Sequence, residues 1–173
     1  MAKLVECVPN FSEGNDMHII DQITAEIKAV EGVSLIDVDP GKATNRTVVT
    51  MVGTPEEVCE AAFRAVKKAS ELIDMKKHKG AHPRFGATDV CPLVPVSNIT
   101  MEETVEYARA LAKRIGEELN IPVYCYENAA FTPERKNLAT CRAGEYEALG
   151  ERLSSEQWHP DFGPRELNEW TAK

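Results

Sequence analysis

The chain has 173 residues, of which 43% are hydrophobic and 28% charged, and its formal net charge is -8. This length and composition are typical of one soluble globular domain. The acidic balance argues against a general nucleic-acid binder, and no apolar run approaches the roughly 20 residues that a membrane-spanning helix needs. The opening residues, MAKLVECVPNF, lack the pattern of an export signal. We therefore expect a cytoplasmic protein that binds neither nucleic acid nor membrane.

The first quarter of the chain alternates between strand and helix patterns. Residues 4–9, 33–39 and 46–52 are short stretches rich in β-branched residues, which are typical of strands. Between the first two, isoleucine and valine recur at helical spacing over residues 16–30. Gly32 follows as a helix terminator, because a residue without a Cβ suits that position.

Five further elements are expected in the rest of the chain. Thr54-Pro55 and Thr100 followed by Glu103 are helix-start signals, because the threonines can cap and the glutamate can reach back. The expected elements are a helix over residues 54–75, a strand over 89–96, a helix over 100–119, a strand over 121–126 and a helix over 142–153. The tail from residue 158 to 170, WHPDFGPRELNEW, is typical of an irregular arm.

The order of these elements predicts the fold class. The first six follow the order β-α-β-β-α-β, which is the split βαβ arrangement of ferredoxin-like folds. A further α-β-α then extends the sheet. We therefore predict an α+β fold, a two-layer α/β sandwich whose mixed sheet carries its helices on one face. The other face keeps an apolar alternation, so we expect something else to cover it.

Five cysteines are scattered along the chain without a CxxC pair. Most have aliphatic, aromatic or small neighbours, which favours reduced and mostly buried thiols. Only the last of them, beside Arg142, has the electropositive neighbour that a reactive thiol needs. They are Cys7, Cys59, Cys91, Cys125 and Cys141.

The loop KKHKGAHPRFGATDVCP, residues 76–92, concentrates the charged chemistry. His78 and His82 are four apart, but Gly80 interrupts any helix, neighbouring lysines repel a cation, and no third ligand lies nearby. We therefore expect no metal. An anion clamp fits better, because Lys79 and Arg84 can hold carboxylates. The alternative is that the lysines only solvate the end of a helix.

His82 is the strongest catalytic candidate in this loop. It lies between Ala81 and Pro83, and a histidine side chain titrates close to neutral pH, as a general base or acid must. Two other loops, residues 8–14 and 37–46, can meet this one in the fold. They carry Asn10 in the first loop and Asp39, Asn45 and Arg46 in the second, although Asp39 can equally be a solvated turn carboxylate.

Several long motifs together resemble one family. They are VECVPNFSEG, DVDPG with its TNRT, LID followed by the HKGAHPR core and DVCP, and RAGEYEAL followed by PDFGP. In these motifs the chain resembles the N-terminal subdomain of glutamate formimidoyltransferase, as found in formimidoyltransferase-cyclodeaminase. The likeness extends over nearly the whole chain, from Leu4 to about Pro164.

This resemblance implies an activity and a set of residues. The family transfers a formimidoyl group from N-formimidoyl-L-glutamate to tetrahydrofolate, its co-substrate, in histidine degradation and one-carbon metabolism. The catalytic histidine of the family falls on His82 and its aspartate on Asp39. The folate-contacting stretch falls on the arm that begins at Gly163, where Gly163, Pro164 and Trp170 match the family pattern.

The residues suit such a transfer. The N5 amine of tetrahydrofolate must lose a proton as it attacks the amidine carbon, and the leaving glutamate nitrogen must gain one. Asp39 suits a planar cationic amidinium, and Arg84 or lysines such as Lys79 suit the glutamate carboxylates. Asn10, Asn45 and Arg46 are expected to help bind substrate or folate.

The resemblance also implies that residues 1–173 form only the first of two similar subdomains, which hold folate between facing sheets. We expect a C-terminal subdomain, or a second copy of the chain, to cover the open sheet face. The alternative hypothesis is a non-catalytic module that keeps the fold and binds folate or a partner.

Overall fold

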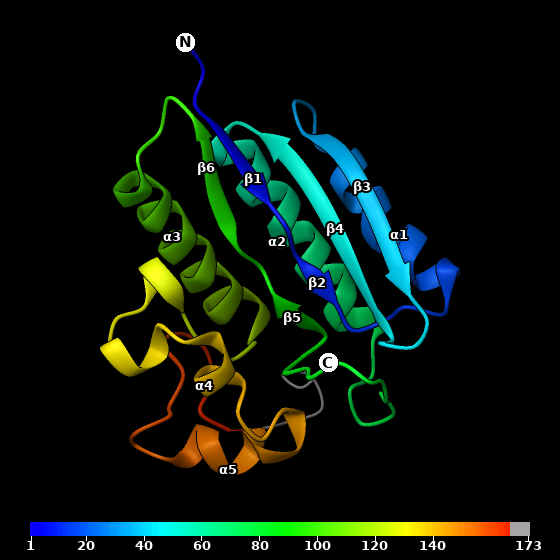
Figure 1. Cartoon of the computed structure of the whole chain (residues 1–173), viewed down its shortest axis with the longest axis vertical. Coiled ribbons are helices and arrows are strands. Elements are labelled where there is room, and N and C mark those ends of the chain that lie inside the picture. Colours follow the sequence, from blue (N-terminus) through cyan, green and yellow to red (C-terminus); the bar gives the residue numbers. More distant parts are fainter. Residues whose placement is uncertain (167–173) are drawn as a thin grey trace.

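The computed structural model describes residues 1–166, which form a sheet with helices packed on one of its faces (Figure 1). β4 pairs with β3 along one edge and with both β1 and β2 along the other. β5 in turn pairs with β2, and β6 pairs with β1. The strands are β1 (Leu4–Cys7), β2 (Asn10–Phe11), β3 (Ser34–Gly41), β4 (Arg46–Gly53), β5 (Thr88–Val90) and β6 (Leu93–Ser97).

The βαββαβ order predicted from the sequence is confirmed, but two predicted strands are each interrupted. β1 and β2 both pair with β4, and Pro9 lies between them, where its missing N–H cannot join the ladder. Cys91 and Pro92 interrupt β5 and β6 in the same way.

The prediction of a mixed sheet was wrong for the described residues, where every pair of strands is antiparallel. The reason lies in the split βαβ topology. β1 and β3 flank the helix α1 (Met17–Lys28) and would be parallel neighbours, but β4 lies between them and runs against both.

Three long helices cover one face. α1 and α2 (Pro55–Leu72) lie behind the strands in Figure 1, and α3 (Met101–Leu119) packs against α2 and β6 at the edge of the sheet. The predicted cap of α3 is confirmed, because the Thr100 hydroxyl accepts from the backbone N–H of Glu103 at 3.1 Å. The Thr54 hydroxyl instead donates to the Glu57 carboxylate at 2.6 Å and makes no cap bond. Among the described helices, none is both long and apolar enough to cross a bilayer.

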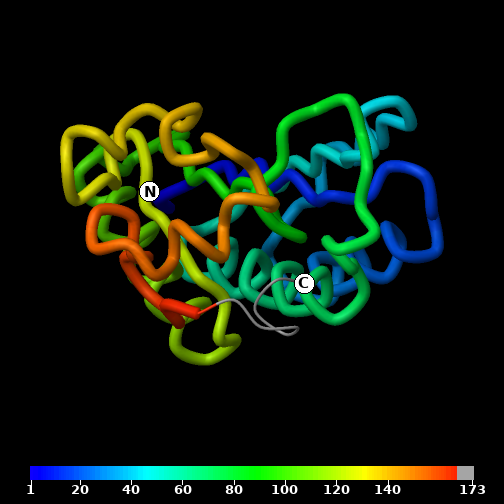
Figure 2. Tube along the Cα trace, turned by 90° about the horizontal axis from the view of Figure 1, so that it is seen from below, coloured from blue at the N-terminus to red at the C-terminus, as the bar shows by residue number. Residues whose placement is uncertain are grey.

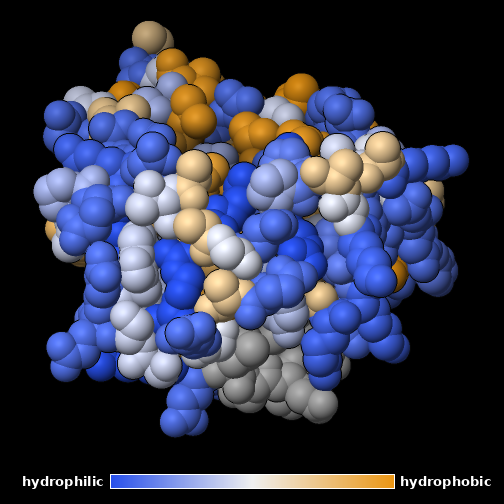
Figure 3. All heavy atoms as spheres, turned by 60° about the horizontal axis from the view of Figure 1, so that its bottom comes forward, coloured by the Kyte–Doolittle hydropathy of each residue, from blue (hydrophilic) through white to orange (hydrophobic). Residues whose placement is uncertain are grey.

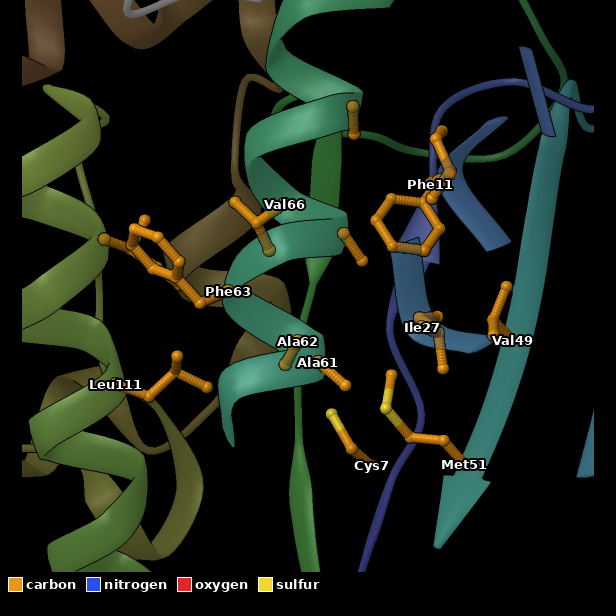
Figure 4. Close-up of a cluster of buried hydrophobic side chains, with 14 of the residues drawn as sticks. Cys7, Phe11, Ile27, Val49, Met51, Ala61, Ala62, Phe63, Val66 and Leu111 are labelled. Atoms are coloured by element: carbon orange, nitrogen blue, oxygen red, sulfur yellow. The ribbon is translucent and has the colours of Figure 1, made fainter. Parts of the chain in front are cut away.

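The core lies between α2 and the strands (Figure 4). Ala61 and Ala62 of α2 are fully buried and let the helix approach the sheet closely, while Phe63 points toward α3. Ile27 of α1 and Met51 of β4 are also fully buried. Burial of a side chain of this size contributes about 1.5–3 kcal/mol. The apolar stripes read from the sequence are therefore the stripes that form the core.

Among residues 1–166, no helix lies on the opposite face of the sheet, as the sequence predicted. Glu6 has Val52 and Val94 as its register partners, so these three side chains share this open face. Val94 keeps 42% of its surface exposed, and Val52 is half-buried. In Figure 3 this open face is turned toward the top of the view, where apolar side chains gather.

The segment after α3 differs from the prediction. Residues 121–126 were expected to extend the sheet, but within the described part of the chain they form a single bridge, between Val123 and Phe162. The reason is local: the backbone of Val123 bonds with Asp161 and Phe162 rather than with a sheet strand, and Pro122 has no N–H to donate. The chain after α3 gathers at the lower end of the molecule, which Figure 2 shows from below, and there the N–H of Tyr146 donates to the carbonyl of Arg84 in the loop before β5 at 3.2 Å.

The helix predicted over residues 142–153 is broken into short pieces. Gly144 and Glu145 have φ angles of +81° and +56°, which an α-helix cannot contain. The pieces in this part of the chain are η1 (Glu127–Ala129), η2 (Pro133–Arg135), α4 (Leu138–Arg142), η3 (Tyr146–Ala148) and α5 (Leu149–Ser154). The arm after residue 157 is irregular as far as it is described, which confirms that prediction.

Candidate functional site

Three loops meet at the lower end of the sheet, as expected from the sequence. Ser12 of the first loop donates its N–H to the carbonyl of Ala87 at 2.8 Å. Asn45 joins all three, because its Oδ1 accepts from Gly14 N at 2.9 Å and its Nδ2 donates to the carbonyl of Lys79 at 3.0 Å. The predicted convergence is confirmed, and Asn45 is its central residue.

The backbone in these loops needs particular residues. Asn45 has a φ of +49°, a left-handed conformation that asparagine tolerates better than most residues. Gly80 lies so close to the turn of residues 42–45 that a Cβ there would be 2.2 Å from the carbonyl oxygen of Thr44. A side chain at residue 80 would therefore push the loops apart.

His82 is half-buried at the junction, against Arg46. Nδ1 of His82 lies 2.6 Å from the carbonyl of Pro83, to which only a protonated nitrogen can donate. Nη1 of Arg46 lies 2.6 Å from Nε2 and 2.8 Å from Nδ1. A guanidinium only donates, and Nη1 of Arg46 lies against the imidazole within reach of both ring nitrogens, while Nδ1 can donate to the carbonyl of Pro83. Burial lowers the pKa of Arg46, and the nearby Asp89 carboxylate partly offsets this.

His78 is buried, with 8% of its surface exposed, and has two partners of opposite kind. Its Nδ1 accepts from Nε of Arg84 at 3.1 Å, and its Nε2 lies 2.8 Å from the carbonyl of Asn45. The Nε2 atom therefore carries the proton. His78 and His82 have different partners, so they do not act as a pair.

Arg84 is buried, and all five of its N–H donors have acceptors. Besides His78 Nδ1, it reaches the carbonyl of His78 at 3.3 Å and Glu145 at 3.2 Å. Glu147 accepts from both terminal nitrogens, at 2.8 and 2.6 Å. This bidentate pair lowers the pKa of Glu147 to about 2 and raises that of Arg84. In this arrangement Arg84 has no donor left for a substrate carboxylate.

Asp89 and Arg142 form a buried pair beneath the loops. The Asp89 side chain is fully buried, its Oδ1 accepts from the backbone of Phe85 at 2.6 Å, and its Oδ2 lies 2.6 Å from Nη2 of Arg142. Burial raises the pKa of Asp89, and Arg142 opposes that shift. The pair ties β5 to α4, and so connects the loops to the segment after α3.

The other predicted site residues lie in different surroundings. Asp39 is exposed on the edge strand β3, and among residues 1–166 no hydrogen bond or ion pair connects it to the His82 loop. Asn10 is buried in β2 and donates to the carbonyl of Val8 at 3.0 Å. The Lys79 side chain is exposed beside the junction, where it is accessible to a ligand.

The predicted folate arm is only partly described. Gly163 has a φ of +92° and lies against residues 121 and 122, where a Cβ would be 2.2 Å from the carbonyl oxygen of Ile121. Pro164 follows it and is half-buried. Trp170 lies outside the described residues.

A mainly apolar cavity of about 370 Å³ lies between β6, α3 and residues 121–129. Asp89 and Arg142 are part of its lining, but His82 and Arg46 are not. Within residues 1–166, no cluster of three or more His, Cys, Asp or Glu side chains could hold a metal ion. The cavity is thus next to the loop junction without opening onto the candidate catalytic histidine.

Sequence reasoning missed several residues of this site. His78 was considered only as a metal ligand, and Glu145, Glu147 and Asp89 were not considered at all. The contacts of Arg84 with Glu145 and Glu147 span 61 and 63 residues of chain, so no local spacing could reveal them. The RAGEYEAL motif was the only signal that pointed to those glutamates.

The two-layer fold and the loop junction define an α+β domain that holds a histidine at the end of its sheet. Residues 4–171 match the family model described as the formiminotransferase domain, N-terminal subdomain. The chain therefore belongs to the formiminotransferase N-terminal subdomain family.

Named relatives agree with this family. The chain is 58% identical over 164 residues to formimidoyltransferase-cyclodeaminase of Mus musculus, with 95% of this chain and 30% of that protein covered. It is 51% identical over 168 residues to glutamate formimidoyltransferase of Streptococcus pyogenes serotype M1, covering 97% of this chain and 56% of that protein. For the enzyme of the same name from Thermoplasma acidophilum the identity is 49% over 163 residues, covering 93% and 54%. The chain thus spans 30% of the first of these relatives and somewhat over half of the other two.

Proposed function

We propose that the chain acts as the first subdomain of a glutamate formimidoyltransferase. It would move the formimidoyl group from N-formimidoyl-L-glutamate to N5 of tetrahydrofolate. The observation that carries this proposal is the position of His82 where three loops meet, with its Nδ1 at the carbonyl of Pro83 and its ring against the guanidinium of Arg46. The names of the relatives support the choice of substrates.

His82 is the proposed general base and acid. N5 of tetrahydrofolate attacks the amidine carbon of the donor, and Nε2 of His82 takes the N5 proton as the new C–N bond forms. The bond from that carbon to the glutamate nitrogen then breaks, and the imidazolium returns the proton to the leaving nitrogen. The products are formimidoyl-tetrahydrofolate and glutamate, and His82 ends in its starting state.

Charged side chains of the loops suit the two ends of the formimidoyl donor, N-formimidoyl-L-glutamate. The exposed carboxylate of Asp39 suits the planar cationic amidinium. Arg46 and Lys79, on either side of the junction, suit the glutamate carboxylates, and contact with a carboxylate would draw Arg46 away from Nε2. The arm that starts at Gly163 and Pro164 and includes Trp170 is the proposed folate contact.

The open sheet face is the proposed contact with a second subdomain. Exposure of the apolar side chains of Val52 and Val94 to water is unfavourable. The relatives also extend well beyond the region that the chain matches. A C-terminal subdomain or a second copy of the chain would cover this face. Residues 1–173 would then be one of two subdomains.

The test is a reconstitution of transfer activity. Formation of formimidoyl-tetrahydrofolate is measured for the chain alone and with the part of the Streptococcus pyogenes relative that the chain does not cover. The matched control splits the streptococcal enzyme at the same place and mixes its own two halves. We expect activity in both mixtures.

If the control mixture is active while this chain is inactive alone and in the mixture, the proposed function is wrong. Binding of tetrahydrofolate without transfer would then favour the alternative, a non-catalytic folate-binding module. Activity of the chain alone, together with a dimer that buries the strand face, would assign the second half to another copy.

A further inference from the structure

His78 is a buried polar residue that takes no part in the proposed reaction. Its partners fix one tautomer: Nδ1 must accept, because Arg84 Nε only donates, and Nε2 must donate to the carbonyl of Asn45. A histidine held in this way couples the position of the Arg84 guanidinium to that of the Asn45 carbonyl. Either neighbour can move only if a buried hydrogen bond is lost, which is unfavourable.

Arg84 fixes the other side of His78. Its guanidinium is planar and rigid, and Glu147 holds it bidentately while Glu145 accepts from both its side chain and its backbone N–H. These glutamates belong to the segment after α3, more than 60 residues away in sequence. The direction in which Nε points is therefore set by that segment.

Asn45 carries the connection to the catalytic candidate. Its carbonyl is held by His78, its side chain by Gly14 and Lys79, and the next residue is Arg46, whose Nη1 contacts His82. The backbone of Ala81 also donates to the carbonyl of Ala43 at 3.0 Å. A displacement of the Asn45 carbonyl would therefore move Arg46 and His82 relative to each other.

We infer that Glu147, Arg84 and His78 form a positioning relay that sets the contact between Arg46 and His82. None of the three touches the substrate; each acts through Asn45. This assigns Arg84 a role different from the direct substrate contact expected from the sequence. The inference rests on the proposed function only for its effect on turnover, because the geometry of His82 can be measured without activity.

Two variants of His78 separate the two ends of the relay. His78→Gln places an amide nitrogen near the position of Nε2, so it can still donate to the Asn45 carbonyl. His78→Asn places its polar atoms near Nδ1, so it can accept from Arg84 but does not reach Asn45. Arg84→Lys keeps the charge but cannot hold Glu147 bidentately and donate to His78 together. Arg64→Lys, at a half-buried pair with Glu60 outside the three loops, is the matched control.

The first readout is the pair of imidazole ¹⁵N resonances of His82 in the labelled chain. We expect them to move in His78→Asn and in Arg84→Lys, and to remain near wild-type in His78→Gln and Arg64→Lys. If Arg84→Lys and His78→Asn leave the His82 resonances unchanged, the relay does not exist. If His78→Gln and His78→Asn shift them equally, the link through Asn45 is wrong.

The second readout is the split between kcat and KM in the reconstituted enzyme. A misplaced catalytic group lowers kcat, so we expect kcat to fall by about 10- to 100-fold in Arg84→Lys and His78→Asn. KM for formimidoylglutamate should stay within about threefold. A rise in KM at constant kcat in Arg84→Lys would instead mean that Arg84 binds substrate, and would overturn the inference. If no transfer is found at all, the proposed function fails, while the resonances still decide on the relay.

Discussion

The sheet with its three helices and the segment after α3 are held together by different forces. The main cluster of buried apolar side chains takes all its fully buried members from residues 5–115. The segment of residues 121–166 instead has arginines at its centre. Arg135 is 4% exposed, pairs with Asp161 at 2.9 Å, and donates to the carbonyls of Gln157 and His159. Arg152 likewise donates to three carbonyls and lies over the ring of Trp158.

This difference shows why the site depends on both regions. The sheet supplies rigid strand ends for His82 and Arg46, and the segment supplies Glu145, Glu147 and Arg142. Apolar packing is insensitive to direction, whereas arginine contacts fix both distance and angle. We therefore expect the first region to determine stability and the second to determine the geometry of the loops.

Asp161→Asn should have the largest effect. It leaves the guanidinium of Arg135 buried with no carboxylate, and removal of one partner of a buried pair costs about 3–5 kcal/mol. Hydrogen exchange followed by mass spectrometry should show faster exchange over residues 121–166 and little change over residues 4–119. Asp21→Asn, at an exposed position of α1, is the control. Equal acceleration in both regions would mean that they unfold as one unit.

Ile27→Ala should destabilise the sheet region by about 2–5 kcal/mol, because it leaves a cavity at a fully buried position. Urea denaturation followed by circular dichroism measures the change in the free energy of unfolding. The matched control is Ile36→Ala, at an isoleucine that is 60% exposed, where we expect a change within about 0.5 kcal/mol. Similar losses for the two variants would contradict the assignment of the core.

Gly80→Ala should separate the loops at a cost of about 1–3 kcal/mol, because its Cβ would lie 2.2 Å from the backbone oxygen of Thr44. The measurement is the exchange rate of amides in residues 76–86. Gly86→Ala in the same loop is the control, since its Cβ would meet nothing closer than 3.6 Å. Slow exchange retained in Gly80→Ala would show that the loops do not depend on this close approach.

Glu147→Gln should have the smallest effect on stability, and the effect should depend on pH. The pKa of Glu147 is lowered to about 2 from 4.5 by Arg84, so its carboxylate stabilises the fold above pH 4.5. That stabilisation is lost as the pH falls toward 2. Because the side chain is 65% exposed, solvent screening keeps the difference to about 1 kcal/mol or less.

The difference in Tm between wild-type and Glu147→Gln should therefore be constant above pH 4.5 and shrink below it. Glu151→Gln, at an exposed residue of α5, serves as the reference variant. A difference that grows on acidification would have the wrong sign for this ion pair.

The sequence predicted the first region far better than the second, for a physical reason. Helices and strands that bury one face leave a periodic apolar pattern, and the helices α1, α2 and α3 all follow it. Residues 121–126 also look like a strand, but their backbone groups bond to residues 161 and 162, and no local pattern encodes that partner. Likewise, the left-handed backbone at Glu145 has no signal beyond the glycine before it.

The candidate site was also only partly predictable. The motif around His82 and the meeting of the three loops were visible, because strand ends in this topology converge. The partners of Arg84 and the tautomer of His78 were not visible, because they depend on side chains that folding brings together from distant segments. Asp39 belongs to the same motif set but lies on an exposed strand, so its role remains a prediction.

The most direct test of the account compares two histidines in an active reconstituted mixture. Single-turnover transfer from formimidoylglutamate to tetrahydrofolate is measured for His82→Ala and for His18→Ala, whose histidine is exposed on α1. Loss of a general base and acid should lower the rate by about 10²- to 10⁴-fold in His82→Ala, while His18→Ala should stay at the wild-type rate. A rate for folded His82→Ala within about twofold of wild-type would contradict the central claim that His82 carries the transfer.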